Sequence, residues 1–387
     1  MDKAVKFIII CFIALMLVGC AGTSKGIVLQ AESTDLINTD PEVAIDYIEI
    51  VKKEENEGVV TEMNSGLITP KPHLNGIKLY TYLKEVYGKK ILSGQQAQWD
   101  NDAEIKIIKE ITGKEPAIRG FDFMDYSPSR TARGAKARDT DAAIEWWKSG
   151  GVVTFCWHWN APMDLIDEGP DKYWHSGFYT KATTFDLAKA LENKESEQYK
   201  GLISDIDVIA VELKKLEQAG VPVLWRPLHE ASGAWFWWGA KGPEPCKELW
   251  IIMYDRLVNH HGLTNLIWVW NGQKKDWYPG DEYVDMIGED IYPPERDYSS
   301  QKQRFVNASG YTEEQKIIAL TENGVIPDPD QLIEDNIPWA WFCTWRGTFV
   351  INSNGSYNEQ YTEKNMLIKT YNHEYVITKD ELPSFLE

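Results

Sequence analysis

The feature that most restricts the fold is a series of eight short apolar runs separated by stretches of helical periodicity. Continuously apolar strands that alternate with helices are typical of a parallel sheet covered by helices. Eight such strands in a chain of 387 residues predict an α/β fold, a closed (β/α)8 TIM barrel rather than an open doubly wound sheet. The expected strands cover residues 90–93, 117–120, 152–157, 223–226, 266–270, 284–289, 316–321 and 339–344.

Helices are expected between these strands, with an acidic N-terminal cap at residues 139–141 and stops at Gly220 and Gly262. One connection, residues 160–204, is long for a strand-to-helix link. Its aromatic side chains either line a cleft or close a small satellite core. The expected helices cover residues 102–111, 139–148, 207–219, 246–259, 298–307, 329–336 and 360–371.

The N-terminus resembles a bacterial lipoprotein signal. Two lysines precede an apolar run at residues 7–18, and Gly19 precedes Cys20. The run is short for a spanning helix of about 20 residues, and the small residue before the cysteine favours lipidation at Cys20 over an ordinary secretory signal. The protein is therefore expected in the bacterial cell envelope, lipid-anchored at the outer membrane or periplasmic face or at the cell surface. The predicted organisation is a signal peptide at 1–19, a tether at 20–73 and one catalytic domain at 74–387.

Composition restricts the partners. The net charge of −19 and pI near 4.9 repel nucleic acid and anionic lipid and suit a neutral or cationic ligand. The 17 tryptophans and 18 tyrosines exceed what a core needs, and indole faces stack well on sugar rings. We expect roughly half of these aromatic residues in the core. The composition thus favours a neutral or cationic ligand such as a sugar and no nucleic acid, and we expect membrane contact through the lipid anchor only and a monomeric protein.

The cysteines indicate neither a disulfide framework nor a zinc site. Apart from Cys11 in the signal and Cys20, only Cys156, Cys246 and Cys343 remain, an odd number without C-x-x-C spacing. Cys156 and Cys343 lie in apolar strands and are expected to be small buried hydrophobes.

Polar and aromatic residues follow the expected strands at their carboxyl ends, where the active sites of such barrels lie. Two of them are glutamates, Glu230 after the fourth strand and Glu322 after the seventh. Glycoside cleavage needs such a pair, one carboxylic acid to protonate the leaving oxygen and one carboxylate to attack or to position water. The other rim residues are His158, Arg226, His229, Asn271, Asp290, Tyr292 and Trp345.

The surroundings suggest a role for each glutamate. Trp225 and Trp235 flank Glu230, and an apolar wall raises a carboxyl pKa, which suits the acid/base role. Glu322 is then the nucleophile, held ionised by neighbours such as Tyr292, His229 or Arg226. For either glutamate alone, an ordinary ion pair at a strand end is an equal alternative; for both together it is a weak one.

Other chemistries have less support in the sequence. His158, His229 and Asp290 form a conceivable metal site, but no H-x-H or H-E-x-x-H spacing accompanies them. No metal is therefore predicted. The chain lacks the G-x-S-x-G of serine hydrolases and the glycine-rich loops that bind phosphates.

These motifs resemble glycoside hydrolase family 26, which consists chiefly of β-1,4-mannanases. The resemblance rests on W-R-P-L-H-E, G-A-W-F-W-W-G, Y-P-G-D-E-Y-V-D-M-I-G-E-D-I-Y and A-L-T-E-N-G, and it covers most of residues 74–371 in order. It implies a (β/α)8 fold, a retaining double displacement and no cofactor. One departure is Leu228, where many members carry a polar or aromatic residue.

The resemblance also implies residue roles. Glu230 matches the acid/base and Glu322 the nucleophile. The other matches are His229 beside the acid/base, Tyr292 holding the nucleophile, Arg226 of the strand-four motif, His158 and Trp235 at the subsites next to the scissile bond, and Trp345 as an aromatic platform. The implied substrates are mannan, glucomannan or galactomannan. The same machinery on mixed-linkage β-glucan or β-xylan, and a non-catalytic glycan-binding lipoprotein, are the alternatives.

Overall fold

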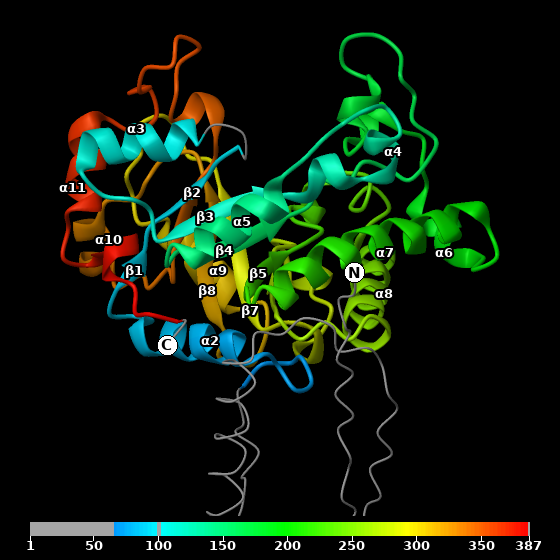
Figure 1. Ribbon diagram of the computed structural model, residues 1–387, viewed down its shortest axis with the longest axis horizontal. Helices are drawn as coiled ribbons and strands as arrows, with labels where there is room; N and C mark the ends of the chain where they lie inside the picture. The colour runs from blue at the N-terminus through cyan, green and yellow to red at the C-terminus, as the bar shows by residue number, and fades with distance from the viewer. Residues whose placement is uncertain (1–65, 99–101, 386–387) are drawn as a thin grey trace, which may run out of the picture. The chain divides into compact units, whose positions relative to one another are not determined.

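Eight parallel strands close into a barrel, and helices surround it (Figure 1). The computed structural model describes residues 66–98 and 102–385, so the signal peptide, Cys20 and most of the expected tether lie outside the described residues. The predicted (β/α)8 barrel is confirmed. Its strands are β2 (Gly94–Gln96), β3 (Ile118–Asp122), β4 (Val152–Cys156), β5 (Val223–Arg226), β6 (Leu266–Trp270), β7 (Met286–Ile291), β8 (Ile317–Asn323) and β9 (Phe342–Thr344).

The seven expected helices are present and most of them differ at their ends, whereas α2, α4 and α6 were not expected. The largest difference is α7 (Glu197–Gln218), which begins ten residues earlier than expected (207 − 197) because Ser196 caps its first turn by accepting from the Tyr199 amide. Within the described residues, no helix is long and apolar enough to cross a bilayer. The others are α2 (Leu74–Val86), α3 (Ala103–Thr112), α4 (Pro128–Thr131), α5 (Asp139–Lys148), α6 (Leu187–Glu192), α8 (Pro243–Tyr254), α9 (Lys302–Ser309), α10 (Pro329–Asp335) and α11 (Lys364–Tyr371).

The expected first strand was wrong. The apolar run at 90–93 supplies β1 (Ile91–Leu92), which pairs outside the barrel with β10 (Val376–Ile377), whereas β2 pairs with β3 and β9. β2 reads as polar, yet Gln95 is buried. Its amide donates to the carbonyl oxygens of Gln96 (2.8 Å) and Thr344 (3.0 Å), so a polar side chain is satisfied inside the barrel.

The chain packs against the barrel before α2. The Ile68 amide donates to Asp285 Oδ1 (2.8 Å), and the Thr69 hydroxyl donates to the Leu266 carbonyl (3.3 Å). Asp285 and Leu266 lie where β7 and β6 begin, at the base of the barrel. The end of the expected tether, residues 66–73, is therefore part of this folded unit.

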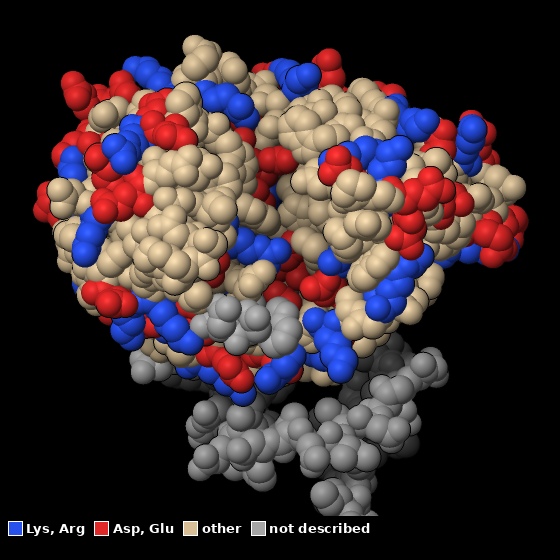
Figure 2. Space-filling model, turned by 90° about the horizontal axis from the view of Figure 1, so that it is seen from above, with Lys and Arg blue, Asp and Glu red and all other residues tan. Residues whose placement is uncertain are grey.

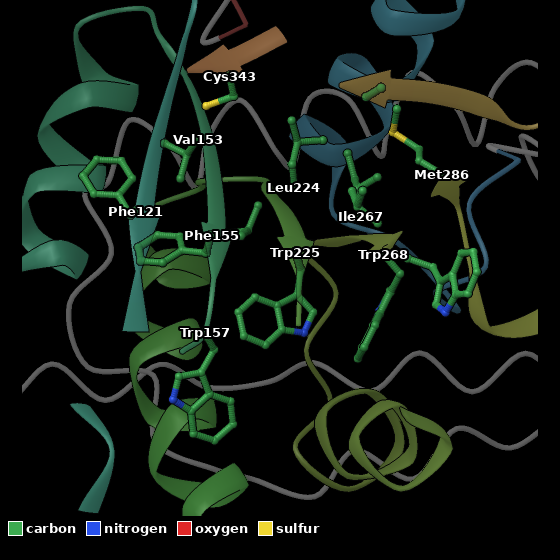
Figure 3. Packing of buried hydrophobic residues seen from close by; sticks show 14 of the residues in the cluster. Phe121, Val153, Phe155, Trp157, Leu224, Trp225, Ile267, Trp268, Met286 and Cys343 are labelled. Carbon is green, nitrogen blue, oxygen red and sulfur yellow. The ribbon is translucent and has the colours of Figure 1, made fainter. Parts of the chain in front are cut away.

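Aromatic side chains fill the space around the strands. Figure 3 shows Phe121, Phe155, Trp225 and Trp268 on neighbouring strands, and the rings of Phe121 and Phe155 stack at 5.1 Å between centroids. The expectation that about half of the aromatic residues serve the core was too low for tryptophan: in the described residues all tryptophans are buried except Trp174, Trp235 and Trp345. The strands are therefore supported by a close-packed layer of aromatic side chains, which holds their ends in place.

The three cysteines of the folded unit are buried free thiols. Cys156 and Cys343 lie in β4 and β9 with no exposed surface, as expected of small hydrophobic side chains.

Candidate active site

The carboxyl ends of the strands open into a cleft of about 450 Å³. Figure 2 looks down on this side of the molecule and shows a groove with acidic and basic atoms in it. Six of the eight residues predicted around the scissile bond line the cleft, and the other two, Arg226 and His229, are buried. The lining residues are His158, Tyr179, Glu230, Trp235, Phe236, Tyr292, Glu322, Trp345 and Phe349.

Glu322 lies within β8 and is buried on the cleft floor. The register between β7 and β8 shifts between Glu289 and Asp290, so that Asp290 pairs with Glu322. Such irregularities re-aim side chains beside active sites. Arg226 donates to Glu322 Oε1, and the Tyr292 hydroxyl donates to Oε2 at 2.7 Å. Both carboxylate oxygens are therefore held by donors.

Arg226 is the centre of a buried ionic network. Its second nitrogen donates to Asp290 Oδ2 at 2.7 Å. Asp290 Oδ1 also accepts from Asn271 (2.8 Å) and Thr321 (2.7 Å). Burial opposes the charge of Arg226, but Asp290 and Glu322 hold the pKa of Arg226 above its usual range. Of the three neighbours expected to hold Glu322 ionised, Arg226 and Tyr292 contact its carboxylate.

A glycine leaves room for this network. A β-carbon on Gly288 of β7 would lie 2.7 Å from the Thr321 side chain and 3.2 Å from the Asn271 amide nitrogen. Any larger side chain would push both donors away from Asp290. The glycine of the I-G-E-D motif is thus explained by close approach.

Glu230 lies just beyond β5, in a loop held in an unusual conformation. Leu228 and Glu230 have φ angles of 51° and 53°, in the left-handed region, which costs of order 1–3 kcal/mol for a residue other than glycine. The Glu230 amide donates to the Asn271 side-chain oxygen (3.0 Å) and carbonyl (2.8 Å). These bonds to the end of β6 fix the loop, which places the carboxyl group in the cleft.

The pKa of Glu230 is raised to about 7, first by burial and then by the negative charge of Glu322. The Trp235 indole N–H donates to Glu230 Oε2 at 2.9 Å and partly offsets that rise. A carboxyl group with this pKa exchanges its proton near neutral pH, as a general acid/base must.

The separation of the two carboxyl groups decides between two mechanisms. Glu230 and Glu322 have carboxylate oxygens within 4.8 Å of each other. Retaining glycosidases keep the carboxyl groups about 5–5.5 Å apart, whereas inverting enzymes leave about 6.5–9.5 Å for a water. The separation is on the short side of this comparison and fits direct attack by one carboxylate.

His158 and His229 lie beside this pair, shortly after the ends of β4 and β5. Their Nε2 atoms are 3.3 Å apart, and His158 Nδ1 lies 2.7 Å from Asp122 Oδ2. Burial lowers the pKa of His229 well below its usual range, and His158 and Arg226 lower it further. His229 is therefore neutral, and its neighbour is His158 rather than Glu322.

The metal site that the sequence made conceivable is not assembled, because Asp290 bonds to Arg226 and Asn271 while the two histidines bond to each other. The described residues hold two other groups of possible ligands, Glu230–Asp290–Glu322 and Asp122–Cys156–His158. In the first, Arg226 already supplies the positive charge. In the second, the histidine and carboxylate form a hydrogen bond.

Several residues of the site were not predicted from the sequence. Asp122, which contacts His158, ends β3 two residues beyond the expected strand, so a longer strand would have placed it at the rim. Phe236 and Phe349 come from loops, whose course the sequence does not reveal, whereas Tyr179 belongs to the long connection whose aromatic residues were expected to line a cleft or close a satellite core, and it lines the cleft. In the tryptophan-rich loop Trp235 faces the cleft, while Trp237 and Trp238 are buried and donate to the carbonyls of Trp159 (2.6 Å) and His229 (3.0 Å).

Comparisons with known proteins agree with this site. The model of glycosyl hydrolase family 26 matches residues 68–381. A mannan endo-1,4-beta-mannosidase of Thermothelomyces thermophilus is 45% identical over 323 residues, which are 83% of this chain and 64% of the relative. Mannan endo-1,4-beta-mannosidase A of Piromyces sp. is 38% identical over 84% of this chain and 52% of its own length. The chain thus spans between half and two thirds of these curated relatives.

Solved structures show the same fold. The Podospora anserina GH26-CBM35 beta-(1,4)-mannanase superposes with a TM-score of 0.78 and 46% identity, over 85% of this chain and 71% of that one. A beta-mannanase from a symbiotic protist of the termite Reticulitermes speratus, complexed with gluco-manno-oligosaccharide, gives a TM-score of 0.72 and 34% identity over 83% and 98%. With a family model that spans most of the barrel domain, the chain belongs to glycosyl hydrolase family 26.

Proposed function

We propose that the protein is an endo-acting mannanase that hydrolyses β-1,4-mannosidic bonds with retention of anomeric configuration. The observation that carries the proposal is the pair Glu230 and Glu322, with carboxylate oxygens within 4.8 Å across one open cleft. The mannanase names of the relatives support the substrate class.

In the first step Glu230 donates its proton to the leaving glycosidic oxygen while Glu322 attacks the anomeric carbon. The bond to the leaving sugar breaks as the bond to the Glu322 carboxylate forms, with inversion. The raised pKa of Glu230, about 7, keeps the acid protonated at neutral pH and below. Arg226 and Tyr292 hold the Glu322 carboxylate in place for the attack.

In the second step Glu230, now a carboxylate, removes a proton from water, and the water oxygen attacks the anomeric carbon. The bond to Glu322 breaks, the second inversion restores the β configuration, and Glu230 is again protonated. One group serves as acid and base because its charge follows that of Glu322, which is neutral as an ester and negative when free.

The cleft offers apolar surfaces for sugar rings. Trp235 is 45% exposed, and Trp345, Phe236 and Phe349 line the same space. Linear mannan, glucomannan and galactomannan are the proposed substrates. They are neutral chains of sugar rings, and these rings can stack on the aromatic faces of the cleft without needing a charged group on the ligand.

The test is hydrolysis of linear mannan, with mixed-linkage β-glucan and β-1,3-xylan in parallel. We expect reducing sugar from mannan, a spread of oligosaccharide sizes at early times, and β products by NMR before mutarotation. Activity on glucan or xylan but not on mannan would mean that the same mechanism acts on another substrate. If the wild type bound mannan but hydrolysed it no faster than a Glu322→Ala variant, the protein would be a glycan-binding protein.

We also propose that the protein is lipid-anchored at Cys20. The support lies in the sequence alone, a basic start, an apolar run and Gly19-Cys20. Growth of the expression host with radiolabelled palmitate should label the wild type and not Cys20→Ala. Release of the wild type into the soluble fraction without label would contradict the anchor.

A further inference from the structure

We infer that Asp122 is a positioning residue that sets the proton positions of His158 and His229 and thereby holds the loop that carries Glu230. The inference rests on the proposed function for its effect on catalysis. Its structural part, the two histidine tautomers, can be measured without any turnover.

Three neighbouring strands supply the three side chains. β3 pairs with β4 at Asp122 and Cys156, and β4 pairs with β5 at Cys156 and Arg226. Asp122 ends β3, His158 follows β4 and His229 follows β5. The three side chains are buried, so their hydrogen bonds are made to one another and not to solvent.

Asp122 can only accept hydrogen bonds on the histidine side. Burial opposes its ionisation, yet the contacts with His158 lower the pKa of Asp122 to about 2, so it is a carboxylate. Oδ1 accepts from the amides of Met124 (2.9 Å) and His158 (3.0 Å). Oδ2 lies 2.7 Å from His158 Nδ1, which therefore carries a proton.

The proton between the two histidines follows from the far side of His229. His229 Nδ1 is buried without a hydrogen-bond partner among the described residues. A proton on Nδ1 would be a buried donor without an acceptor and would lose the hydrogen bond that it makes in water, whereas Nε2 has an acceptor within reach. The His229 proton therefore resides on Nε2 and is donated to His158 Nε2, 3.3 Å away.

The chain of hydrogen bonds begins at His229, the residue directly before the acid/base residue. His229 lies between Leu228 and Glu230, the two residues with positive φ, and its carbonyl accepts from the Trp238 indole at 3.0 Å. The imidazole of His229 is thus one of the anchors of a strained loop. A change in the protonation or hydrogen bonding of this imidazole therefore acts on the peptide next to Glu230.

Asp122→Asn reverses this order while keeping the size of the side chain. The asparagine oxygen is needed by the two backbone amides at the Oδ1 position, so the NH2 group faces His158 Nδ1. His158 must then accept at Nδ1 and carry its proton on Nε2. His229 must accept at Nε2, and its proton moves to Nδ1, where the described residues offer no acceptor.

Histidine tautomers are read directly by long-range ¹H–¹⁵N correlation on protein labelled with ¹⁵N-histidine. The chain has seven histidines, and spectra of His158→Gln and His229→Gln assign the two signals. We expect Nδ1–H for His158 and Nε2–H for His229 in the wild type, and the reverse in Asp122→Asn. Unchanged tautomers in Asp122→Asn, or a doubly protonated His158 in the wild type, would overturn the inference.

The catalytic consequence is tested with two substrates. Asp122→Asn should lower kcat on mannan roughly 10- to 100-fold, the usual cost of losing an orienting partner. The loss should be smaller on an aryl mannoside with a good leaving group, because such a group needs little help from Glu230. Equal losses on both substrates would mean that Asp122 supports the fold and not the acid.

A matched control removes a comparable carboxylate at the other end of the barrel. Asp285 is buried and accepts from the amides of Ile68 (2.8 Å) and Trp268 (2.7 Å). Asp285→Asn should lower the melting temperature. Any loss in kcat in this variant should be the same for mannan and for the aryl mannoside. In the double variant Asp122→Asn/His229→Gln the losses in kcat should not add, and additive losses would contradict action through His229.

If mannan is not a substrate at all, the proposed function fails while the tautomer result still stands or falls by itself.

Discussion

On one side of the barrel mouth a glutamate lies within a strand, and on the other side a glutamate lies in a strained loop. Glu322 belongs to β8, is buried, and has a cation and a phenol on its two oxygens. Glu230 follows β5 with a φ of 53°, and an indole N–H is its side-chain donor. The same side chain is therefore held in two different ways.

The difference explains how two identical groups take opposite roles. Donors on both oxygens hold the carboxylate of Glu322 and fix its direction, as a nucleophile requires. Burial and the charge of Glu322 raise the pKa of Glu230 to about 7. Each environment depends on the other, since the charge on Glu322 is part of what keeps the proton on Glu230.

The largest effect should follow removal of the strand-borne carboxylate. Glu322→Ala leaves no nucleophile, and kcat on mannan should fall on the order of 10⁴-fold or more. Steady-state kinetics measure the loss. With azide added, an activated β-mannoside should yield the α-mannosyl azide, because azide attacks from the vacated side. A β-azide from this variant would reverse the roles of the two glutamates.

Removal of the loop-borne carboxyl should give a smaller effect that depends on the substrate. Glu230→Ala should lower kcat on mannan about 10²- to 10⁴-fold, the usual contribution of general acid–base catalysis. With a good leaving group the first step should persist, so the mannosyl-enzyme accumulates and mass spectrometry of the protein detects it. Azide should then give the β-mannosyl azide. Equal losses on both substrates would deny Glu230 the role of acid.

The sequence predicts the strand side of this comparison better than the loop side. β8 is apolar up to Thr321, so the place of Glu322 at a strand's carboxyl end follows from hydrophobic pattern alone. Arg226 and Tyr292 were expected among its neighbours and do contact it, but the hydrophobic pattern alone does not show how they reach it. Arg226 and Tyr292 reach Glu322 from β5 and from beyond β7, and a bulge sets the register of Asp290. Long-range pairing of this kind is fixed by barrel closure and is absent from local sequence.

The loop side was predicted in composition and not in conformation. W-F-W-W-G indicated a site and the family resemblance assigned Trp235 to it, but the loop conformation that turns this indole to the cleft depends on backbone angles at Leu228, Glu230 and Ala234, all with positive φ. Residues other than glycine give no sequence signal for that conformation. Asp122 was missed because β3 ends in a charged residue, so the hydrophobic pattern does not show that the strand continues to Asp122.

The donors on Glu322 can be tested one at a time. Tyr292→Phe removes the hydroxyl that lies 2.7 Å from Oε2. A hydrogen bond to a charged group contributes about 1.5–3 kcal/mol, so kcat should fall roughly 10- to 100-fold. Burial of the hydroxyl, together with Glu322, raises the pKa of Tyr292 well above its usual range, so the hydroxyl donates at any working pH.

The matched control is Tyr311→Phe. Its hydroxyl donates to the buried Glu289 at 2.9 Å, which in turn is bound by Arg304 and does not line the cleft. We expect Tyr311→Phe to cost stability and to leave kcat near the wild-type value. If both variants lost activity alike, the hydroxyl of Tyr292 would be structural.

The smallest effect concerns Trp235, which donates to the Glu230 side chain. Since Glu230 acts as an acid with a pKa of about 7, kcat/KM should fall as pH rises through about 7, where the proton is lost. Trp235 donates to the charged form and lowers this pKa. Trp235→Phe keeps an apolar wall and removes the donor, so the basic limb of the profile should move to higher pH, by about one unit or less. A shift to lower pH would mean that the indole acts mainly by excluding water. The raised pKa of Glu230, on the loop side, would then come from Trp235 more than from Glu322.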